Sequence, residues 1–262
     1  MKNRKAAYHR NKAMIKASIR DIYHSHGGVD GYRTMQVYLR RKGTYISCAT
    51  VHKYMNTEMQ LFSVSRRKKP GYVHGAAHKV YDNRLKQNFH AKKRNRKWCT
   101  DFTYLTLADG RKRYNCTIID LYDRSVIASI TDRNITSDLA KRTLEKAIRS
   151  RSGIDLKQLI LHSDQGSQYT SREFTEFCIE KGITQSMSKA GYPYDNAPME
   201  RYFNTLKTEL IYQHNYRTET ELYSAIEEFA YVHYNHVRPH SYNNYKTPFE
   251  TRYGRYKPDT KI

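Results

Sequence analysis

Hydrophobic and polar positions along residues 98–262 alternate between the two-residue period of strands and the roughly 3.6-residue period of helices. Runs of β-branched and aromatic residues bounded by turn residues predict five strands, at residues 98–107, 114–121, 125–131, 156–162 and 183–187. Apolar residues at helical spacing predict four helices, at residues 137–149, 170–180, 198–212 and 219–235. Three strands in a meander, followed by helices and strands in turn, indicate an α/β fold: a mixed five-stranded sheet with flanking helices.

The first third of the chain shows helical spacing only. Apolar residues predict helices at residues 11–24 and 32–41, and glycine follows shortly after each as a stop signal. A third, short helix is expected around residues 51–55, with Ser47 or Thr50 as its N-cap. The N-terminal part is therefore predicted to be a small helical region.

Two short helices joined by a glycine-containing turn are typical of a helix-turn-helix. In that interpretation Thr50, His52 and Lys53 face a groove of DNA. A small basic helical hairpin without base contacts fits the same spacing. The pattern by itself leaves both interpretations open.

The positive charge of the chain is concentrated before residue 98. Residues 1–97 hold 24 Lys and Arg against 4 Asp and Glu, whereas residues 98–262 hold 23 against 21, and the formal net charge is +22. Such a basic surface implies a polyanionic partner, and the asymmetry suggests an electrostatic anchor attached to a domain with a separate task. Residues 63–97 combine basic runs with proline and glycine, so we predict a basic linker there rather than a packed unit.

The sequence lacks the features of several other protein classes. No run approaches the roughly 18 apolar residues of a membrane helix, and the basic N-terminus lacks the apolar core of a signal peptide. We therefore expect a cytoplasmic protein without a membrane segment. His74 and His78 have no cysteine nearby, so we expect no zinc site. The four cysteines lie far apart, so we expect no dense disulfide framework. The cysteines, which form no C-x-x-C pair, are Cys48, Cys99, Cys116 and Cys178.

Three carboxylates stand where an α/β sheet keeps its reactive groups. Asp101 sits inside an otherwise apolar strand, which is costly unless the carboxylate is paired or bound to a cation. Asp164 directly follows the fourth strand, and the C-terminal edge of a strand is a usual place for chemistry. Glu200 opens a helix on which Asn204 and Lys207 follow at i+4 and i+7, so the three share one face.

Carboxylates from two strands and a helix can together hold two divalent ions. Hard oxygen ligands suit Mg²⁺, and we expect Mn²⁺ to substitute for it. Two such ions about 4 Å apart activate an attacking oxygen and stabilise a leaving oxygen in an in-line phosphoryl transfer. Chemistry of this kind on DNA fits the basic N-terminal third. The spacing alone is weak support, because the chain has 25 acidic residues.

Neighbouring polar residues have simpler structural interpretations. We expect Asp120 and Asp123 to serve in a turn or a salt bridge rather than as a further carboxylate of the site. His162 is expected to be a buried, hydrogen-bonded residue. Either Asn196 or Asp195 is expected to cap the helix that follows them, since both residue types are preferred N-caps.

The sequence context of the three carboxylates is much more specific than their spacing. Asp101 lies in W-C-T-D-F-T-Y, Asp164 in H-S-D-Q-G-S-Q-Y and Glu200 in D-N-A-P-M-E-R-Y-F-N-T-L-K. Between the second and third carboxylates lie 35 residues. With these motifs the chain resembles OrfB, the catalytic second-reading-frame product of bacterial insertion-sequence transposases of the "IS-three" type. That family belongs to the DDE superfamily, together with retroviral integrases.

The resemblance extends over nearly the whole chain. Residues 27–61 are similar to the helix-turn-helix region of the family, and the tail motif Y-N-H-V-R-P-H at residues 234–240 is similar to its closing signature. Arg238 in this motif is a candidate DNA contact, although buried hydrogen bonding around it is an equal alternative. Four parts follow: a helical DNA-binding region at 1–62, the linker at 63–97, a DDE catalytic core at 98–215, and a C-terminal helix and tail at 216–262.

The resemblance implies a fold and an activity. It implies an RNase H-like core in which Asp101, Asp164 and Glu200 are the catalytic, metal-binding triad. Lys207 is implied to contact the DNA of the transposon end, and we place Asn204 in the same contact. The expected reaction is Mg²⁺-dependent strand cleavage and strand transfer at the ends of the insertion sequence. The expected partners are end and target DNA, further copies of the chain on that DNA, and the upstream reading-frame product or a fusion with it. Acting on DNA, the protein would be associated with the nucleoid.

Two other functions are compatible with parts of the sequence. A DNA-binding regulator could use the RNase H-like part as a silent scaffold, but the intact triad argues against it. A general RNase H-type nuclease or resolvase is disfavoured by the tail signature and by the basic N-terminal region.

Overall fold

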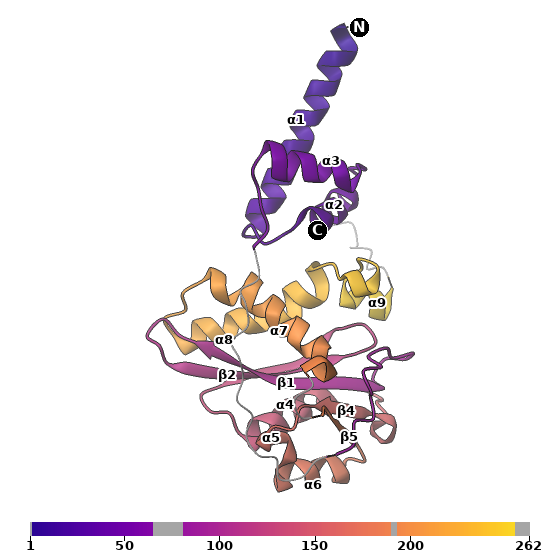
Figure 1. Ribbon diagram of the computed structural model, residues 1–262, viewed down its shortest axis with the longest axis vertical. Coiled ribbons are helices and arrows are strands. Elements are labelled where there is room, and N and C mark those ends of the chain that lie inside the picture. Colours follow the sequence, from indigo (N-terminus) through magenta and orange to yellow (C-terminus); the bar gives the residue numbers. More distant parts are fainter. Residues whose placement is uncertain (1, 65–80, 190–192, 255–262) are drawn as a thin grey trace. The chain divides into compact units, whose positions relative to one another are not determined.

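The computed structural model describes residues 2–64, 81–189 and 193–254 of the chain. It divides into two compact units, Met1–Arg67 and Lys68–Ile262 (Figure 1). The first unit is helical and the second holds a sheet between two layers of helices. His74 and His78 lie outside the described residues.

The N-terminal unit packs three helices around one small core. They are α1 (Lys2–Ser25), α2 (Tyr32–Arg41) and α3 (Cys48–His52), and the π-helix η1 (Lys53–Glu58) continues α3. The α2 bounds are those that the apolar spacing predicted. Ser47 is the N-cap of α3, because its side-chain oxygen accepts a hydrogen bond from the main-chain nitrogen of Thr50. The fully buried core side chains include Ile19, Met35, Leu39, Val51 and Met55.

The second unit is built on a five-stranded mixed sheet. Its strands are β1 (Lys97–Thr106), β2 (Lys112–Asp120), β3 (Val126–Asp132), β4 (Ile160–Ser163) and β5 (Thr184–Met187). Their order is β3-β2-β1-β4-β5. The meander β1–β2–β3 is antiparallel, whereas β4 pairs parallel with both β1 and β5. The predicted mixed sheet is therefore confirmed.

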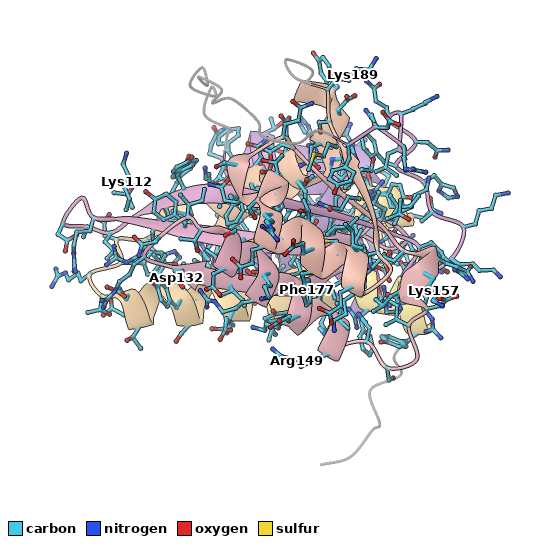
Figure 2. The ribbon with its side chains drawn as sticks, turned by 90° about the horizontal axis from the view of Figure 1, so that it is seen from below. Lys112, Asp132, Arg149, Lys157, Phe177 and Lys189 are labelled. Carbon is cyan, nitrogen blue, oxygen red and sulfur yellow. The ribbon has the colours of Figure 1, made fainter. Side chains whose placement is uncertain are left out.

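Helices cover both faces of this sheet (Figure 1). One face carries α4 (Ser137–Arg149), α5 (Ser167–Thr170) and α6 (Arg172–Glu180) over a core that includes Trp98 and Leu144. Figure 2 looks onto this face, with Phe177 and Arg149 on its helices, Lys112 and Asp132 toward one end and Lys157 toward the other. The opposite face carries four helical segments, α7 (Ala197–Glu209), α8 (Glu219–Glu227), the π-helix η5 (Glu228–Val237) and α9 (Pro248–Tyr253).

Several boundaries differ from the prediction for local reasons. The fourth strand starts at Ile160, because residues Leu156–Gln158 form a 3-10 turn. The helix expected at 170–180 is split, since Ser171 breaks it and caps α6 by accepting from the main-chain nitrogen of Phe174. The long helix expected to end at residue 212 stops at Glu209, where a 3-10 turn follows.

Residues 81–96, which we call the strap, correct the prediction of a linker reaching residue 97. Leu85 and Ala91 are buried in the core that α7 and η5 share with β1 and β2. Main-chain atoms of the strap are also bonded to the sheet: the nitrogen of Asn95 donates to Asp120 and the oxygen of Phe89 accepts from Arg124. The basic composition suggested a tether, but the apolar residues between the charges anchor this segment to the second unit.

The C-terminal part of the described chain is fastened to the end of β2 by a buried ion pair. Arg252 of α9 donates to Asp123 at 2.6 Å and also to Asp120, and all three side chains are almost completely buried. Burial and the neighbouring charge of Asp123 raise the pKa of Asp120, whereas Arg252 opposes this rise. Both aspartates thus have the salt-bridge role that the sequence suggested, and neither belongs to the site described next.

Candidate active site

The parallel pairing of β1 with β4 brings two of the predicted carboxylates to the same place. Cys99 of β1 is paired with His162 of β4. Asp101 and Asp164 each lie two residues further along. Because side chains two residues apart share a face of the strand, Asp101 points to the same side as Cys99, which packs in the core beneath α7. Glu200, in the first turn of α7, lies above that side.

The electrostatics of Asp101 shows how closely these groups are placed. Burial and the charge of Asp164 raise its pKa well above the usual value, and the charge of Glu200 adds to the rise. The main-chain nitrogen of Phe102 donates to Asp101 at 2.7 Å and, with the nearby Lys207 ammonium, acts in the opposite direction. The structure therefore gathers three carboxylates and one ammonium that come from three separate elements of the sequence.

The carboxylates fit a divalent cation in kind and in charge. They are hard oxygen donors that repel one another, and a bound cation would relieve that repulsion. In the described part of the chain, no three His, Cys, Asp or Glu side chains already converge as a metal site. Asp101 and Asp164 instead accept hydrogen bonds from the main-chain nitrogens of Phe102 and Gly166.

The start of α7 is held against β1 by an amide. The side chain of Asn196 donates to the main-chain oxygen of Thr100 at 3.3 Å, next to Asp101. Asn196 occupies the N-cap position but makes no capping hydrogen bond through its side chain. Asp195 also accepts from other parts of the fold instead of from α7. The prediction that either residue caps the helix by its side chain was wrong. The Asp195 carboxylate accepts from tertiary donors, whereas the Asn196 amide turns its nitrogen to Thr100 and its oxygen has no hydrogen-bond partner among the described residues.

Two further predicted residues, Asn204 and His162, lie near the carboxylates. Asn204 is half-buried on α7, at helical spacing between Glu200 and Lys207. His162 is completely buried and hydrogen-bonded to Ser186, which confirms its structural interpretation. Burial lowers the pKa of His162, so the neutral imidazole is favoured.

Arg238 of the tail motif is held by a carboxylate of α7. Its guanidinium donates two hydrogen bonds to Glu209, at 2.8 and 2.7 Å. The neighbouring tail residue His240 is buried and bonded to the main-chain oxygen of Tyr234. Hydrogen bonding within the protein therefore accounts for much of this motif.

The predicted DNA-facing residues of the N-terminal unit lie on α3 and at the start of η1. His52 and Lys53 are exposed, and the His52 ring lies edge-on to Tyr32 with centroids 5.0 Å apart. The hydroxyl of Thr50 is bonded to that of Ser47 at 2.9 Å. Of these three candidates, His52 and Lys53 are thus the side chains presented to the surface.

No feature of the sequence indicated that the strap contributes to the surroundings of the site. Asn83 and Gln87 bond to Asp195, more than a hundred residues away along the chain. Neither residue lies in a periodic pattern or a recognisable motif. Only the D-N-A-P run itself drew attention to Asp195, and it suggested the wrong role.

Comparison with known proteins agrees with this architecture. Two family models described as "Integrase core domain" match residues 91–193 and 181–248, and one described as "HTH-like domain" matches residues 9–69. The match to the HTH-like domain decides in favour of the helix-turn-helix over a plain helical hairpin. A solved simian T-cell lymphotropic virus intasome, in complex with PP2A regulatory subunit B56 gamma, superposes with a TM-score of 0.52 at 19% identity. The superposition covers 85% of this chain and 72% of the intasome chain, and it confirms the RNase H-like fold.

Two curated relatives are similar over most of their length. The putative transposase InsK for insertion sequence element IS150 of Escherichia coli is 33% identical over 94% of this chain and 85% of its own length. The transposase for insertion sequence element IS904 of Lactococcus lactis is 30% identical over 90% of this chain and 92% of its own length. The chain therefore belongs to the insertion-sequence transposases of the IS-three type, with an HTH-like domain and an integrase core domain.

Proposed function

We propose that this chain carries out transposition as a polynucleotidyl transferase, with Asp101, Asp164 and Glu200 as the metal-binding catalytic residues. One observation supports the assignment above all others. The charges of Asp164 and Glu200 both raise the pKa of Asp101, which supports one shared site beside β1 and the C-terminal end of β4. Repulsion of this kind is costly to maintain unless a cation is bound during function.

The reaction consists of two phosphoryl transfers at DNA. A water oxygen attacks a phosphodiester at the element end and a 3′ oxygen leaves as a hydroxyl. The released 3′-hydroxyl then loses its proton and attacks a second phosphodiester, whose own 3′ oxygen leaves and takes up a proton. Two Mg²⁺ ions, or Mn²⁺ in their place, would supply activation of the attacking oxygen and stabilisation of the leaving one. The chain's own contribution is to hold the three carboxylates in place from two strands and a helix.

Lys207 and Asn204 are the proposed DNA contacts beside the carboxylates. They follow Glu200 on the same face of α7, and the Lys207 ammonium is close enough to Asp101 to lower its pKa. A DNA phosphate bound at the carboxylates would therefore lie next to the Lys207 ammonium. Arg238 is a proposed contact that DNA would share with Glu209.

The HTH-like domain is proposed to bind the end DNA through Thr50, His52 and Lys53. The excess of Lys and Arg in residues 1–97 supports this, since these cations can pair with phosphates whatever the DNA sequence.

We further propose that several copies act together on the two ends, and that the upstream reading-frame product takes part. In the described part of the chain, no helix is long and apolar enough to span a bilayer. A nucleoid location is proposed from the DNA substrate alone.

The test uses a labelled duplex of the element's own end, incubated with the protein and Mg²⁺, with and without the upstream product. We expect strand cleavage or joining that Asp164→Ala abolishes while end binding is retained. Asp155→Ala is the matched control, because Asp155 is an exposed carboxylate that bonds only within its own turn among the contacts described. Binding without metal-dependent cleavage by the unsubstituted protein would favour the silent regulator instead.

A further inference from the structure

Asp195 is a buried carboxylate surrounded by hydrogen-bond donors. It lies in the 3-10 turn η3 (Pro193–Asn196), immediately before α7, and only 3% of it is exposed. One carboxylate oxygen accepts from the main-chain nitrogen of Lys189 at 3.0 Å and from the side chain of Asn83 at 2.8 Å. The other accepts from the side chain of Gln87 at 2.9 Å. One side chain thus joins the strap, the segment after β5 and the start of α7.

The three donors favour the ionised carboxylate of Asp195 over its protonated form. Burial raises the pKa of Asp195, but the hydrogen bonds from Lys189, Gln87 and Asn83 outweigh it, so the pKa lies below its usual value. All three partners donate, and a main-chain nitrogen cannot reverse its role. An amide at this position has only one acceptor oxygen, so with that oxygen on Lys189 and Asn83 its NH2 group would face the NH2 group of Gln87.

The main chain of Asp195 makes a second connection, to β4. Its carbonyl oxygen lies 2.8 Å from Nε2 of His162. A carbonyl only accepts, so Nε2 carries the proton and Nδ1 accepts from the hydroxyl of Ser186 at 2.9 Å. The Ser186 oxygen in turn accepts from the main-chain nitrogen of Arg84, in the strap. These bonds all run in one direction, from the strap through β5 and β4 to the turn before α7.

The same short turn is therefore bonded next to both aspartates and leads directly into the helix that carries Glu200. His162 is two residues before Asp164, and Asn196 bonds to Thr100, the residue before Asp101. Glu200 lies in the first turn of the helix that begins at Ala197. A shift of this turn would move Glu200 relative to the two aspartates.

We propose that Asp195 is a positioning residue of the active site, which with Asn83 and Gln87 fixes the start of α7 relative to β1 and β4. This inference rests on the proposed function of the three carboxylates. It assigns the strap a role in catalysis, because the strap supplies two of the three donors that hold Asp195. Asp195 itself touches neither metal nor DNA in this role.

The test compares Asp195→Asn with a variant that loses a buried carboxylate elsewhere in the same unit. Asp123→Asn is the matched control, because Asp123 is completely buried and bonded to Arg252 and Ser125, away from the carboxylates. Both variants are assayed at a temperature at which circular dichroism shows them folded. The first measurement is the single-turnover rate of cleavage of a prebound end duplex. The second is the Mn²⁺ concentration at half saturation, from calorimetry. The third is the rate of amide hydrogen exchange in the first turn of α7, without metal.

We expect Asp195→Asn to lower the cleavage rate and weaken Mn²⁺ binding by about 10- to 100-fold, the range seen for residues that orient metal ligands. End-duplex affinity should be unchanged, and exchange in the first turn of α7 should rise more than in α4. Asp123→Asn should change the cleavage rate and Mn²⁺ affinity by less than about threefold on the same scale.

A swap of the carboxylate and amide groups provides a rescue. In the double variant Gln87→Glu with Asp195→Asn, the new amide keeps its oxygen on Lys189 and Asn83 and donates to the new carboxylate at position 87. Asn83 is unchanged in this variant and still accepts from the main-chain nitrogen of Lys86 at 2.8 Å. We expect the double variant to recover at least tenfold of the lost rate, on the scale of that range.

The proposal is overturned if Asp195→Asn cleaves and binds Mn²⁺ like the unsubstituted protein, if Asp123→Asn causes the same losses, or if the swap recovers nothing. Failure of the proposed function looks different. In that case the unsubstituted protein itself shows no metal-dependent cleavage. Mn²⁺ affinity and exchange at α7 then still decide whether Asp195 fixes this turn.

Discussion

The carboxylate of Asp164 accepts a hydrogen bond from the main-chain nitrogen of Gly166 at 2.9 Å, and a β-carbon added at Gly166 would lie 2.9 Å from that same oxygen. The glycine thus leaves room for the carboxylate where it leaves β4. An added methyl group would force Asp164 away from its place beside Asp101.

Gly166→Ala is therefore expected to lower the rate of strand cleavage by about tenfold or more, because displacement of a catalytic group by about 1 Å can cost 10²-fold. Single-turnover cleavage of the end duplex measures this. Gly31→Ala is the control, since a β-carbon there would meet its nearest atom, in Ser63, at an ordinary 3.6 Å. Equal rates for the two variants would contradict the explanation.

Lys207→Ala is expected to weaken binding of the end duplex and to reduce the salt dependence of binding by about one phosphate contact. Binding of Mn²⁺ should not weaken, because the substitution removes a positive charge from beside Asp101. Anisotropy titrations at several salt concentrations and a Mn²⁺ titration measure the two effects. Lys157→Ala is the control at an exposed lysine that precedes β4. Unchanged end binding and turnover in Lys207→Ala would refute the contact.

Arg252→Met is expected to reduce the free energy of unfolding by about 3–5 kcal/mol, because it leaves Asp120 and Asp123 buried without their partner. Urea denaturation measures this loss. Arg172→Met removes an ion pair with Glu176 in which both side chains are well exposed to water, and it should change the free energy of unfolding far less than Arg252→Met. A loss below about 1 kcal/mol in Arg252→Met would show that the buried pair contributes little.

His240 is expected to make the protein less stable in acid. Burial and the nearby charge of Arg238 lower its folded-state pKa to about 3, from about 6.5 in the unfolded chain. Between these values the unfolded state binds more protons, so stability falls as pH drops from about 6.5 toward 3, by up to about 1.4 kcal/mol per pH unit. Urea midpoints at pH 7, 6 and 5 measure the slope. His240→Gln should give a shallower slope, and an identical slope would exclude His240 as its source.

Much of the sheet and its covering helices could be predicted from periodicity alone. The helix Ser137–Arg149 begins and ends at the predicted residues, because its apolar stripe coincides with a cap at Thr136. The three carboxylates were found through their motifs, and the pairing of β1 with β4 explains why they meet. Their assignment as metal ligands remains a prediction.

The parts that sequence reasoning missed depend on contacts between distant segments. Asp195 and Asn196 are good helix caps by type, yet their side chains bond to strap residues and to Thr100. The strap is basic and aperiodic, so its composition resembles a linker, while Leu85 and Ala91 supply the burial that fixes it. Local propensity contains no information about partners a hundred residues away.

The pairing of Asp120 with Arg252 also affects when the catalytic unit can finish folding during synthesis. The two residues are 132 positions apart, so the positive partner of Asp120 leaves the ribosome only after almost the whole catalytic unit has been synthesised. Until then the end of β2 carries two carboxylates that cannot be buried at low cost. Completion of this unit is thus delayed until α9 has been synthesised, and products terminated before α9 would remain incompletely folded and open to proteolysis.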